Sequence, residues 1–220
     1  MSAVADTRAV PQLAFAVEGT AVQELAAVPT LRLSVRIERT GGGPVRAIAL
    51  QAQVRIAAPR RGYDAPTQAR LKELFGTPDQ WGRSLQSLLW THATVMVGPF
   101  DAATTIALPV PCTYDFDVTA AKYLHALRGG DIPLDLLFSG TVFSRASDGH
   151  LQVTQIASDC EASFGLPVRV WSEAMERSFG DRIWLRLSRD AFDRLYAYRA
   201  RHVLGTWEQT VDALLAKADA

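Results

Sequence analysis

The sequence predicts an α+β protein, mainly an antiparallel β-sandwich with a helical insertion and a C-terminal helical segment. Two patterns predict this fold class: runs in which apolar and polar residues alternate, and later runs with apolar residues at helical spacing. The clearest alternating run covers residues 30–57, and its period of two places the apolar residues on one face of a strand. These apolar residues are Leu31, Leu33, Val35, Ile37, Ile48, Leu50, Ala52, Val54 and Ile56.

A glycine-rich turn divides this run into two strands. Residues 40–44 read Thr-Gly-Gly-Gly-Pro. Glycine allows the positive φ that a chain reversal needs, and proline does not fit inside a central strand. The sequence therefore predicts one long antiparallel hairpin over residues 30–57, with an apolar and a polar face. The apolar face needs a second layer to cover it, so the other strands are expected to complete a sandwich.

The other alternating runs supply the remaining strands. They predict strands over residues 13–17, 90–97, 104–109, 114–118, 132–144 and 151–155. Pro109 and Pro111 are expected to end the third of these strands, and Gly140 is expected to form a bulge in the fifth. Asp148 and Gly149 are a hairpin turn signal before the last strand. Residues 120–127 fit either a helix or a strand.

Residues 65–89 are expected to form a helical insertion that covers one end of the sheet. Asp64 is a candidate N-cap, Pro66 fits the first helical turn, and Gly76 is a natural helix stop. A second short helix is expected over residues 78–88. The insertion therefore belongs to the sandwich domain, which we expect to span residues 12–164 after a disordered tail at residues 1–11.

From residue 165 to residue 220 the pattern is mainly helical. One helix is expected over residues 168–179, and a second begins after Ser188 and runs to about residue 204. Ile183, Leu185 and Leu187 predict a short strand between these helices. In the last helix Thr206 begins a capping box, and four residues are expected to face inward. These four residues are Trp207, Val211, Leu214 and Leu215.

Composition is that of an ordinary globular protein, with 48% hydrophobic and 21% charged residues and a formal net charge of zero. Zero net charge argues against binding nucleic acid mainly through phosphate contacts, since that mode needs an excess of Lys and Arg. Residues 1–11 lack a signal-peptide pattern, and no apolar stretch is long enough to span a bilayer. We therefore expect a cytoplasmic protein without membrane insertion, in which Cys112 and Cys160 are reduced thiols.

The chemically reactive residues do not form a motif. His92, Cys112 and Asp115 are weak candidates for a metal site or a thiolate centre, because these residue types ligate transition metals and activate nucleophiles. Nothing in their spacing brings them together, so packing or surface roles are favoured. We expect no catalytic residue, no cofactor and no metal, and therefore a protein that is not an enzyme.

Other polar groupings have ordinary interpretations as well. The acidic pairs at 115/117 and 131/135 could bind a cation, but a solvated strand face is favoured. Arg60 and Arg61, with Tyr63 and Arg145, could form an anion patch, but exposed loop arginines are favoured. The glycine runs at 41–43 and 129–130 do not follow a strand and open a helix, so nucleotide binding is rejected.

Two alternative functions stay open. Residues 182–218 follow a strand-helix-helix order that resembles a ribbon-helix-helix DNA-binding unit. That resemblance implies a DNA-binding regulator whose base-reading residues would be Arg182, Trp184, Arg186 and Ser188. A helical hairpin packed on the sandwich is favoured over this interpretation. The second alternative is a sandwich that binds a small ligand or carbohydrate on an aromatic face lined by Trp81, Trp90 and Tyr114.

Several stretches together resemble an uncharacterised bacterial family, mostly from high-GC Gram-positive organisms. They are residues 54–63 (VRIAAPRRGY), 89–92 (LWTH), 109–116 (PVPCTYDF), 121–127 (AKYLHAL), 137–143 (LFSGTVF), 184–187 (WLRL) and 197–202 (AYRARH). Genes of this family are often encoded near [NiFe]-hydrogenase genes. The resemblance therefore implies an accessory protein that assists assembly or maturation of a [NiFe]-hydrogenase, and it implies no catalytic residues. We expect a non-enzymatic interaction protein with a hydrogenase subunit or maturation factor as partner, and a homo-oligomer stays open.

Overall fold

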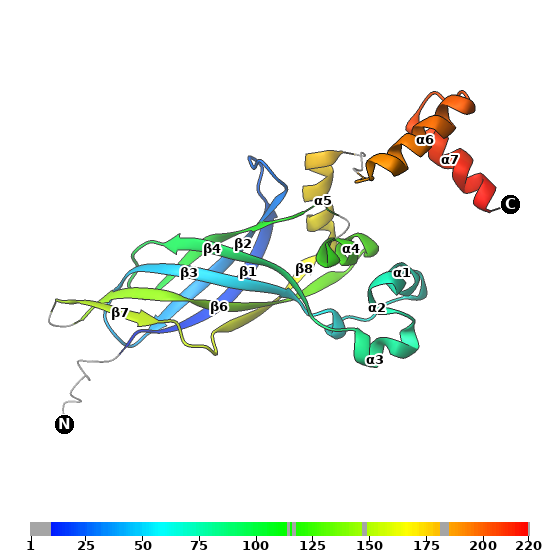
Figure 1. The fold of residues 1–220 in the computed structure, drawn as a ribbon. Helices are drawn as coiled ribbons and strands as arrows, with labels where there is room; N and C mark the ends of the chain where they lie inside the picture. Colours follow the sequence, from blue (N-terminus) through cyan, green and yellow to red (C-terminus); the bar gives the residue numbers. More distant parts are fainter. Residues whose placement is uncertain (1–9, 114, 116–117, 147–148, 181–184, 220) are drawn as a thin grey trace. The chain divides into compact units, whose positions relative to one another are not determined.

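The computed structural model describes residues 10–113, 115, 118–146, 149–180 and 185–219. The chain divides into two compact units, one up to residue 182 and the other from residue 183 onward. The first unit holds two antiparallel sheets and the helices at one end of them, and the second holds two helices (Figure 1). The predicted α+β class, with mainly antiparallel sheets, is confirmed.

The first unit is a sandwich of a three-stranded and a five-stranded sheet. The smaller sheet has the order β1-β2-β5 and consists of β1 (Gln12–Val22), β2 (Thr30–Thr40) and β5 (Ala103–Pro111). The larger sheet has the order β4-β3-β6-β7, and β8 also pairs with β6. Its strands are β3 (Val45–Ile56), β4 (Leu88–Val97), β6 (Asp131–Arg145), β7 (Leu151–Gln155) and β8 (Glu161–Pro167).

The predicted hairpin over residues 30–57 is wrong in its pairing. Both halves are strands, but β2 pairs with β1 and β5, whereas β3 pairs with β4 and β6. The glycine-rich loop therefore carries the chain from one sheet to the other. Gly41 and Gly42 have φ of 67° and 60°, and Arg39 Nη1 donates to the Gly42 carbonyl at 2.8 Å. Crossing between layers buries both apolar faces against each other, which two strands of one sheet could not do.

The core lies between the two sheets. The alternating apolar residues of β2 and β3 are at most 1% exposed and belong to one buried cluster. Phe15 on β1 stacks on Phe138 of β6, with ring centroids 4.2 Å apart, and so joins the two layers. Each fully buried Leu, Ile or Val side chain of this cluster stabilises the fold by about 1.5–3 kcal/mol relative to an exposed one. This burial fixes the inner faces of both sheets and leaves the outer faces free to differ.

β5 extends through Pro109, which was expected to end it, and ends at Pro111. Pro109 pairs with Arg32, and Pro111 pairs with Thr30. β5 hydrogen bonds to β2 alone, so it is an edge strand. An edge strand tolerates proline because the missing N–H can face away from the neighbouring strand.

β8 is a strand that the sequence analysis did not predict. Ala162, Phe164 and Leu166 alternate along it, and β6 is its hydrogen-bonding partner. The predicted strand over residues 114–118 falls mostly outside the described residues, as does Asp148 of the predicted turn. The sequence left open whether residues 120–127 form a helix or a strand. Residues 120–126 lie in a helix, α4 (Thr119–Ala126), and residue 127 is its C-cap.

The predicted helical insertion consists of short helices between β3 and β4. They are η1 (Ala58–Arg60), α1 (Ala65–Arg70), α2 (Lys72–Phe75), η2 (Pro78–Gln80) and α3 (Trp81–Ser84). Asp64 caps α1 by accepting a bond from the Thr67 amide at 2.9 Å, as predicted. The helix expected over 78–88 is shorter, because Leu88 already pairs with Ile56 in the sheet. Among the described residues no helix has the length and apolar character needed to cross a membrane.

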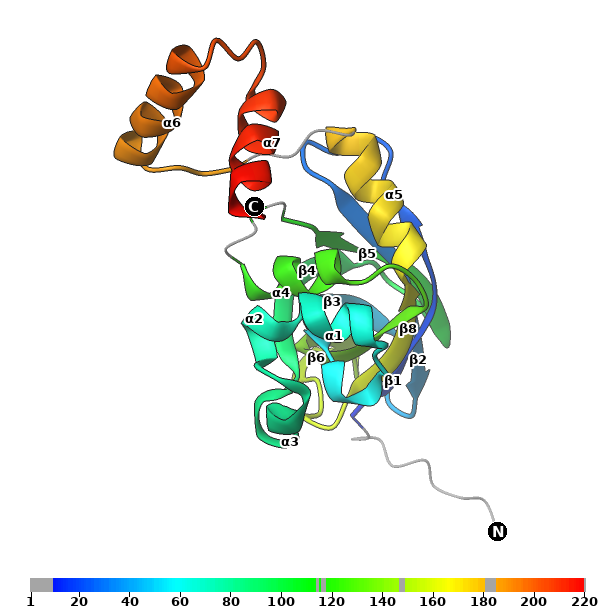
Figure 2. The same cartoon turned by 90° about the vertical axis from the view of Figure 1, so that its right-hand side faces the viewer.

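The helices of the first unit gather at one end of the sandwich, as Figure 2 shows from that side. A cluster of aromatic rings joins the insertion to α4. The Tyr63 hydroxyl donates to the Ala58 carbonyl and accepts from the Tyr123 hydroxyl, both at 2.8 Å. Burial raises the pKa of both phenols, which therefore stay protonated. α5 (Val168–Phe179) packs against β1, β2 and β8, so it belongs to the sandwich unit.

The second unit contains α6 (Arg189–Arg201) and α7 (Trp207–Ala218). Both predicted caps are confirmed: Ser188 Oγ accepts from the Ala191 amide at 3.2 Å, and Thr206 with Gln209 forms a capping box. Residues 185–188 carry no regular secondary structure, so the described part of the predicted strand is not a strand. Ile183, its first residue, lies outside the described residues.

Gly140 does not form the predicted bulge. It pairs in register with Leu50, and β6 changes its partner from β8 to β7 on either side of this position. Its φ is 138°, and an added Cβ would lie 2.0 Å from the Ala49 carbonyl oxygen. Glycine is needed here because the backbones of β3 and β6 approach closely.

We predict that Gly140→Ala lowers the free energy of unfolding by roughly 3 kcal/mol, through the contact with Ala49 and the strained φ. Urea denaturation followed by circular dichroism measures the change. Gly82→Ala is the matched control, since a Cβ there meets nothing within 4 Å. Its helical position makes alanine neutral or stabilising by up to about 1 kcal/mol. Equal stability of the two variants would contradict the close approach.

Candidate functional site

The outer face of the five-stranded sheet carries an unusual set of side chains. Along the middle of four neighbouring strands, a set of outward residues contains no Asp, Glu, Lys or Arg. We call this set the uncharged face. Its members are Ala47, Ala49, Gln51, Gln53, His92, Thr94, Met96, Ser139, Thr141, Phe143, Val153 and Gln155.

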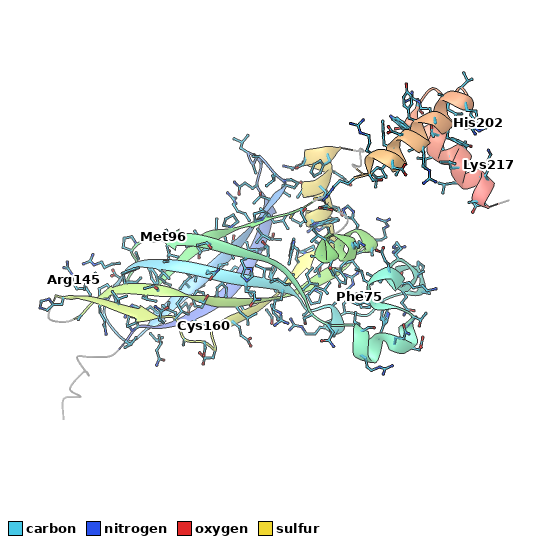
Figure 3. All side chains as sticks on the ribbon, in the orientation of Figure 1. Phe75, Met96, Arg145, Cys160, His202 and Lys217 are labelled. Atoms are coloured by element: carbon cyan, nitrogen blue, oxygen red, sulfur yellow. The ribbon has the colours of Figure 1, made fainter. Side chains whose placement is uncertain are left out.

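The strand register sets these residues side by side in rows. Gln51 of β3 lies between Thr94 of β4 and Ser139 of β6. Adjacent strands lie about 4.8 Å apart, so a row of neighbours presents a continuous surface of amide and hydroxyl groups. Met96 and Val153 stand at the two sides of the face and are 65% and 54% exposed. Figure 3 labels Met96 on β4.

The outer face of the three-stranded sheet is different. It carries Glu18, Arg32, Arg36 and Glu38 on β1 and β2. Arg36 Nε lies 2.7 Å from Glu38 Oε1 and 3.9 Å from Glu18 Oε1, and these carboxylates raise the pKa of its guanidinium. A charged, ion-paired sheet face is the usual solvated arrangement. The uncharged face is therefore a property of one side of the sandwich.

An uncharged face is suited to contact with another molecule. Charged residues are depleted at the centres of protein interfaces, because removing an ion from water costs several kcal/mol. Amide and hydroxyl groups can exchange water for partner groups at a smaller cost. Charged residues border the face, and these are Arg46, Arg55, Asp135, Arg145 and Glu161. A neutral centre with a charged border matches the anatomy of a protein interface.

The structure does not bring the three weak metal candidates together. His92 is exposed on the outer face of β4, whereas Cys112 is 4% exposed and belongs to the core. Asp115 lies in the loop after β5, where its amide donates to Thr113 Oγ1 at 3.1 Å. Among the described residues, no group of three His, Cys, Asp or Glu side chains is placed to hold a metal ion.

The two described aromatic residues of the proposed ligand-binding face, Trp81 and Trp90, have contacts within the protein. Trp81 donates its Nε1 hydrogen to the Gly76 carbonyl at 3.1 Å and packs edge-on against Tyr63, with ring centroids 5.3 Å apart. Trp90 is half-buried against the core from β4. Tyr114 lies outside the described residues. The described tryptophans thus have structural contacts of their own.

A mixed-charge groove of about 590 Å³ lies at the helical end of the sandwich. The start of β6 and the first turns of α5 line it, and its charged residues are Arg128, Arg169, Asp131, Glu173 and Glu176. Positive and negative groups are nearly balanced there, so the groove does not select a ligand of one charge. Its lining contains no Cys, His or Tyr.

The two arginines of the proposed anion patch are held by the protein itself. Arg60 forms an ion pair with Asp135 and lies 3.3 Å from Ser163 Oγ. Arg61 donates to the Asp131 carbonyl at 2.6 Å. Arg145 lies at the other end of the long strand β6, as its label in Figure 3 shows. Arg60 and Arg61 therefore fasten η1 to the sheet and line one pocket of about 390 Å³, to which Arg145 does not belong.

The residues proposed to read DNA bases do not form a ribbon in the described chain. Arg182 and Trp184 lie outside the described residues. Arg186 and Ser188 lie before α6 in a segment without strand structure, and Ser188 serves as the α6 N-cap.

The two cysteines are free thiols in different surroundings. Burial raises the pKa of Cys112 to about 12, and its Sγ donates to the Val110 carbonyl at 3.7 Å. Burial also raises the pKa of Cys160, with a further contribution from Asp159, but this side chain is only partly buried. A raised pKa lowers the thiolate fraction, and only the thiolate reacts.

We predict that alkylation of the native protein near pH 8 modifies Cys160 and spares Cys112. Mass spectrometry of iodoacetamide-treated protein measures the extent at each site. Cys160→Ser should abolish native labelling, whereas Cys112→Ser should leave it unchanged. In denaturant the wild-type protein should take up two labels, one on each cysteine. Rapid native labelling of Cys112 would contradict its burial.

Comparison with known proteins places the chain in a family without assigning it a function. No curated protein matches. Similar solved structures include an ApaA protein from Bordetella pertussis, with 13% identity and a TM-score of 0.23 over 72% of this chain and 93% of that one. β-Glucosidase 3B from Thermotoga neapolitana has 15% identity and a TM-score of 0.26 over 72% of this chain and 17% of that one.

A β-glucosidase from Kluyveromyces marxianus has 15% identity and a TM-score of 0.24 over 72% of this chain and 15% of that one. TM-scores this low support no structural or functional argument for any of the three. A family of unknown function, DUF6084, matches residues 10–220, which is nearly the whole chain. The chain therefore belongs to the DUF6084 family.

Proposed function

We propose that this protein is a non-enzymatic interaction protein that binds a partner protein through the uncharged face. The observation that carries the proposal is the contrast between the two outer faces of the sandwich. Four neighbouring strands present no charged side chain over the uncharged face, whereas the opposite face carries ion-paired Glu18, Arg36 and Glu38. A solvated sheet face has no physical need to exclude charge, but an interface centre does.

The uncharged face is the outer surface of a sheet, which favours a macromolecular partner. Small-molecule sites are concave and enclose most of their ligand, whereas a regular sheet surface encloses little. A protein partner covers about 800 Å² on each side of a standard interface and reaches the charged border as well. Apolar groups such as Met96 and Val153 then gain from burial at about 25 cal/mol per Å². Neutral neighbours such as Thr94 lose little on desolvation.

We further propose that the partner is a subunit or a maturation factor of a [NiFe]-hydrogenase. The support for this part is the family resemblance, which extends over nearly the whole chain after residue 10 and implies such an accessory role. An accessory of this kind needs a binding surface and no catalytic residues of its own. The expected location, the cytoplasm, stays a prediction.

We predict that Thr94→Glu, on the β4 side of the uncharged face beside Gln51, reduces recovery of the hydrogenase component at least tenfold. A carboxylate there must be desolvated without a partner charge, which costs several kcal/mol. The measurement is affinity purification of the tagged full chain from the organism that encodes it. Quantitative mass spectrometry then compares hydrogenase subunits and maturation factors between variants.

Thr105→Glu is the matched control, because Thr105 is also an exposed strand threonine but lies on the opposite face beside Arg36. It should leave recovery unchanged, and both variants should keep the wild-type melting temperature within a few degrees. Equal recovery with Thr94→Glu would refute the proposed surface. Purification that recovers no hydrogenase component with the wild-type chain would refute the proposed partner.

A further inference from the structure

The helical unit from residue 183 onward has almost no hydrophobic core of its own. Among its described residues, 185–219, the only buried side chain is that of Thr210, a polar residue. Thr210 Oγ1 donates to the Thr206 carbonyl at 2.9 Å, so it belongs to the first turn of α7. Contacts within the unit therefore leave its described apolar side chains partly exposed.

These apolar side chains form stripes along both helices. On α7, Trp207, Val211, Leu214 and Leu215 follow helical spacing, and on α6 Phe192, Leu195 and Tyr196 do the same. The sequence predicts that the α7 stripe faces inward, but Val211, Leu214 and Leu215 are 43%, 37% and 57% exposed. Phe192 and Tyr196 are 40% and 57% exposed. An amphipathic helix pair with an exposed apolar face lacks a packing partner.

The connection between the two helices is nevertheless well fixed. Arg199 donates to the carbonyls of Leu204 and Gly205 at 3.1 and 2.6 Å, and its guanidinium lies 4.7 Å from the Trp207 ring centroid. Phe192 lies 5.5 Å from the same ring, centroid to centroid. The hairpin therefore presents its exposed apolar face in a defined geometry.

The described part of this unit, residues 185–219, is small for an independent fold. The whole unit runs from residue 183 to residue 220. Units below about 40 residues rarely bury enough surface to fold alone and usually need a disulfide, a metal or oligomerisation. Cys112 and Cys160 both lie in the first unit, and among the described residues no metal-holding group occurs. Oligomerisation is the route that fits.

The charges of the two helices are opposite and equal. α6 carries Arg189, Arg194, Arg199 and Arg201 against Asp190 and Asp193, a net charge of +2. α7 with its C-cap carries Glu208, Asp212 and Asp219 against Lys217, a net charge of −2. Two identical hairpins are therefore complementary to each other when α6 of one lies against α7 of the other. Two α6 helices facing each other would repel.

We propose that the α6–α7 hairpins of two chains pack against each other and form a homodimer. In this arrangement α6 of each chain lies on α7 of the other, and the apolar stripes fill a shared core. A two-fold axis makes this contact twice with the same residues, as an isologous interface requires. The dimer uses none of the residues of the uncharged face. Its formation and the binding of a hydrogenase component can therefore be tested separately.

The charge pattern permits a test in which two defective variants restore each other. One variant, Arg189→Glu with Arg194→Glu, reverses the net charge of α6. The other, Asp212→Arg with Asp219→Arg, reverses the net charge of α7. All four side chains are exposed, and the substitutions spare Arg199 and Glu208, which act at the helix junction and in the first turn of α7. Sedimentation equilibrium of the full chain measures the mass over a range of concentrations.

The wild-type chain should sediment with twice its monomer mass of 24.0 kDa. Each reversed variant alone should dissociate at least tenfold more readily, because like charges then meet across the dimer. An equimolar mixture should regain the doubled mass with one chain of each kind, as a tag on one variant reports. Contacts within each hairpin are the same in the mixture as in the separate variants, so only pairing between chains explains the recovery.

Two controls distinguish the loss of contacts between hairpins from a general effect of changed charge or of a lost apolar side chain. Arg46→Glu with Arg145→Glu makes the same charge change on exposed sites of the sandwich and should keep the wild-type dimer. Leu215→Glu should give a monomer, whereas Leu25→Glu, at a residue 95% exposed in the first unit, should not. A monomeric wild-type chain at all concentrations would overturn the proposal. A mixture of the two reversed variants that stays monomeric would also overturn it.

Discussion

The packing of β2 against β3 from opposite layers is the constraint on which the rest of the structure depends. Each strand has one apolar face, and the glycine-rich loop between them turns both faces toward the same core. Leu33 and Val35 on one side, and Leu50 and Val54 on the other, are at most 1% exposed. Because this burial occupies the inner face of each sheet, every strand added to β2 or β3 extends one layer of the sandwich.

The same constraint explains why the two outer faces can serve different purposes. The inner positions are fixed by packing, and the outer positions are free of it. On the smaller sheet these positions hold the ion pairs of Arg36, the ordinary solution for a solvated surface. On the larger sheet β3 and its neighbours bring neutral residues such as Gln51, Thr94 and Ser139 into one row. The proposed binding role accounts for this difference.

The two units of the chain also differ in how they gain stability. The sandwich buries a continuous apolar cluster and is reinforced at its helical end by the hydroxyl bridge between Tyr63 and Tyr123. The helical hairpin has well-capped helices and a fixed junction at Arg199, but its apolar stripes stay exposed. A stable sandwich joined to a hairpin with exposed apolar stripes is consistent with the proposed role in assembly.

Signals that act over a few residues could be read from the sequence alone. The caps at Asp64, Ser188 and Thr206 are present because a cap depends on the next three residues only. The bounds of α5 and the buried faces of β2 and β3 follow from local periodicity in the same way. For the candidate site, the neutral residues at the middle outer positions of each strand were visible, but not that these four strands are neighbours.

The tertiary structure alone decided which strands pair. Periodicity assigns a residue to a face, whereas hydrogen-bonding partners lie far apart in the chain, so the crossing between β2 and β3 could not be read locally. Edge position likewise decided that Pro109 fits within β5. His92 and Cys112 were separated for the same reason: one faces outward from β4 and the other inward after β5. The amino-acid sequence alone determined the local secondary structure and which face of each strand is apolar. Which strands are neighbours was decided by the burial of two apolar faces in one core.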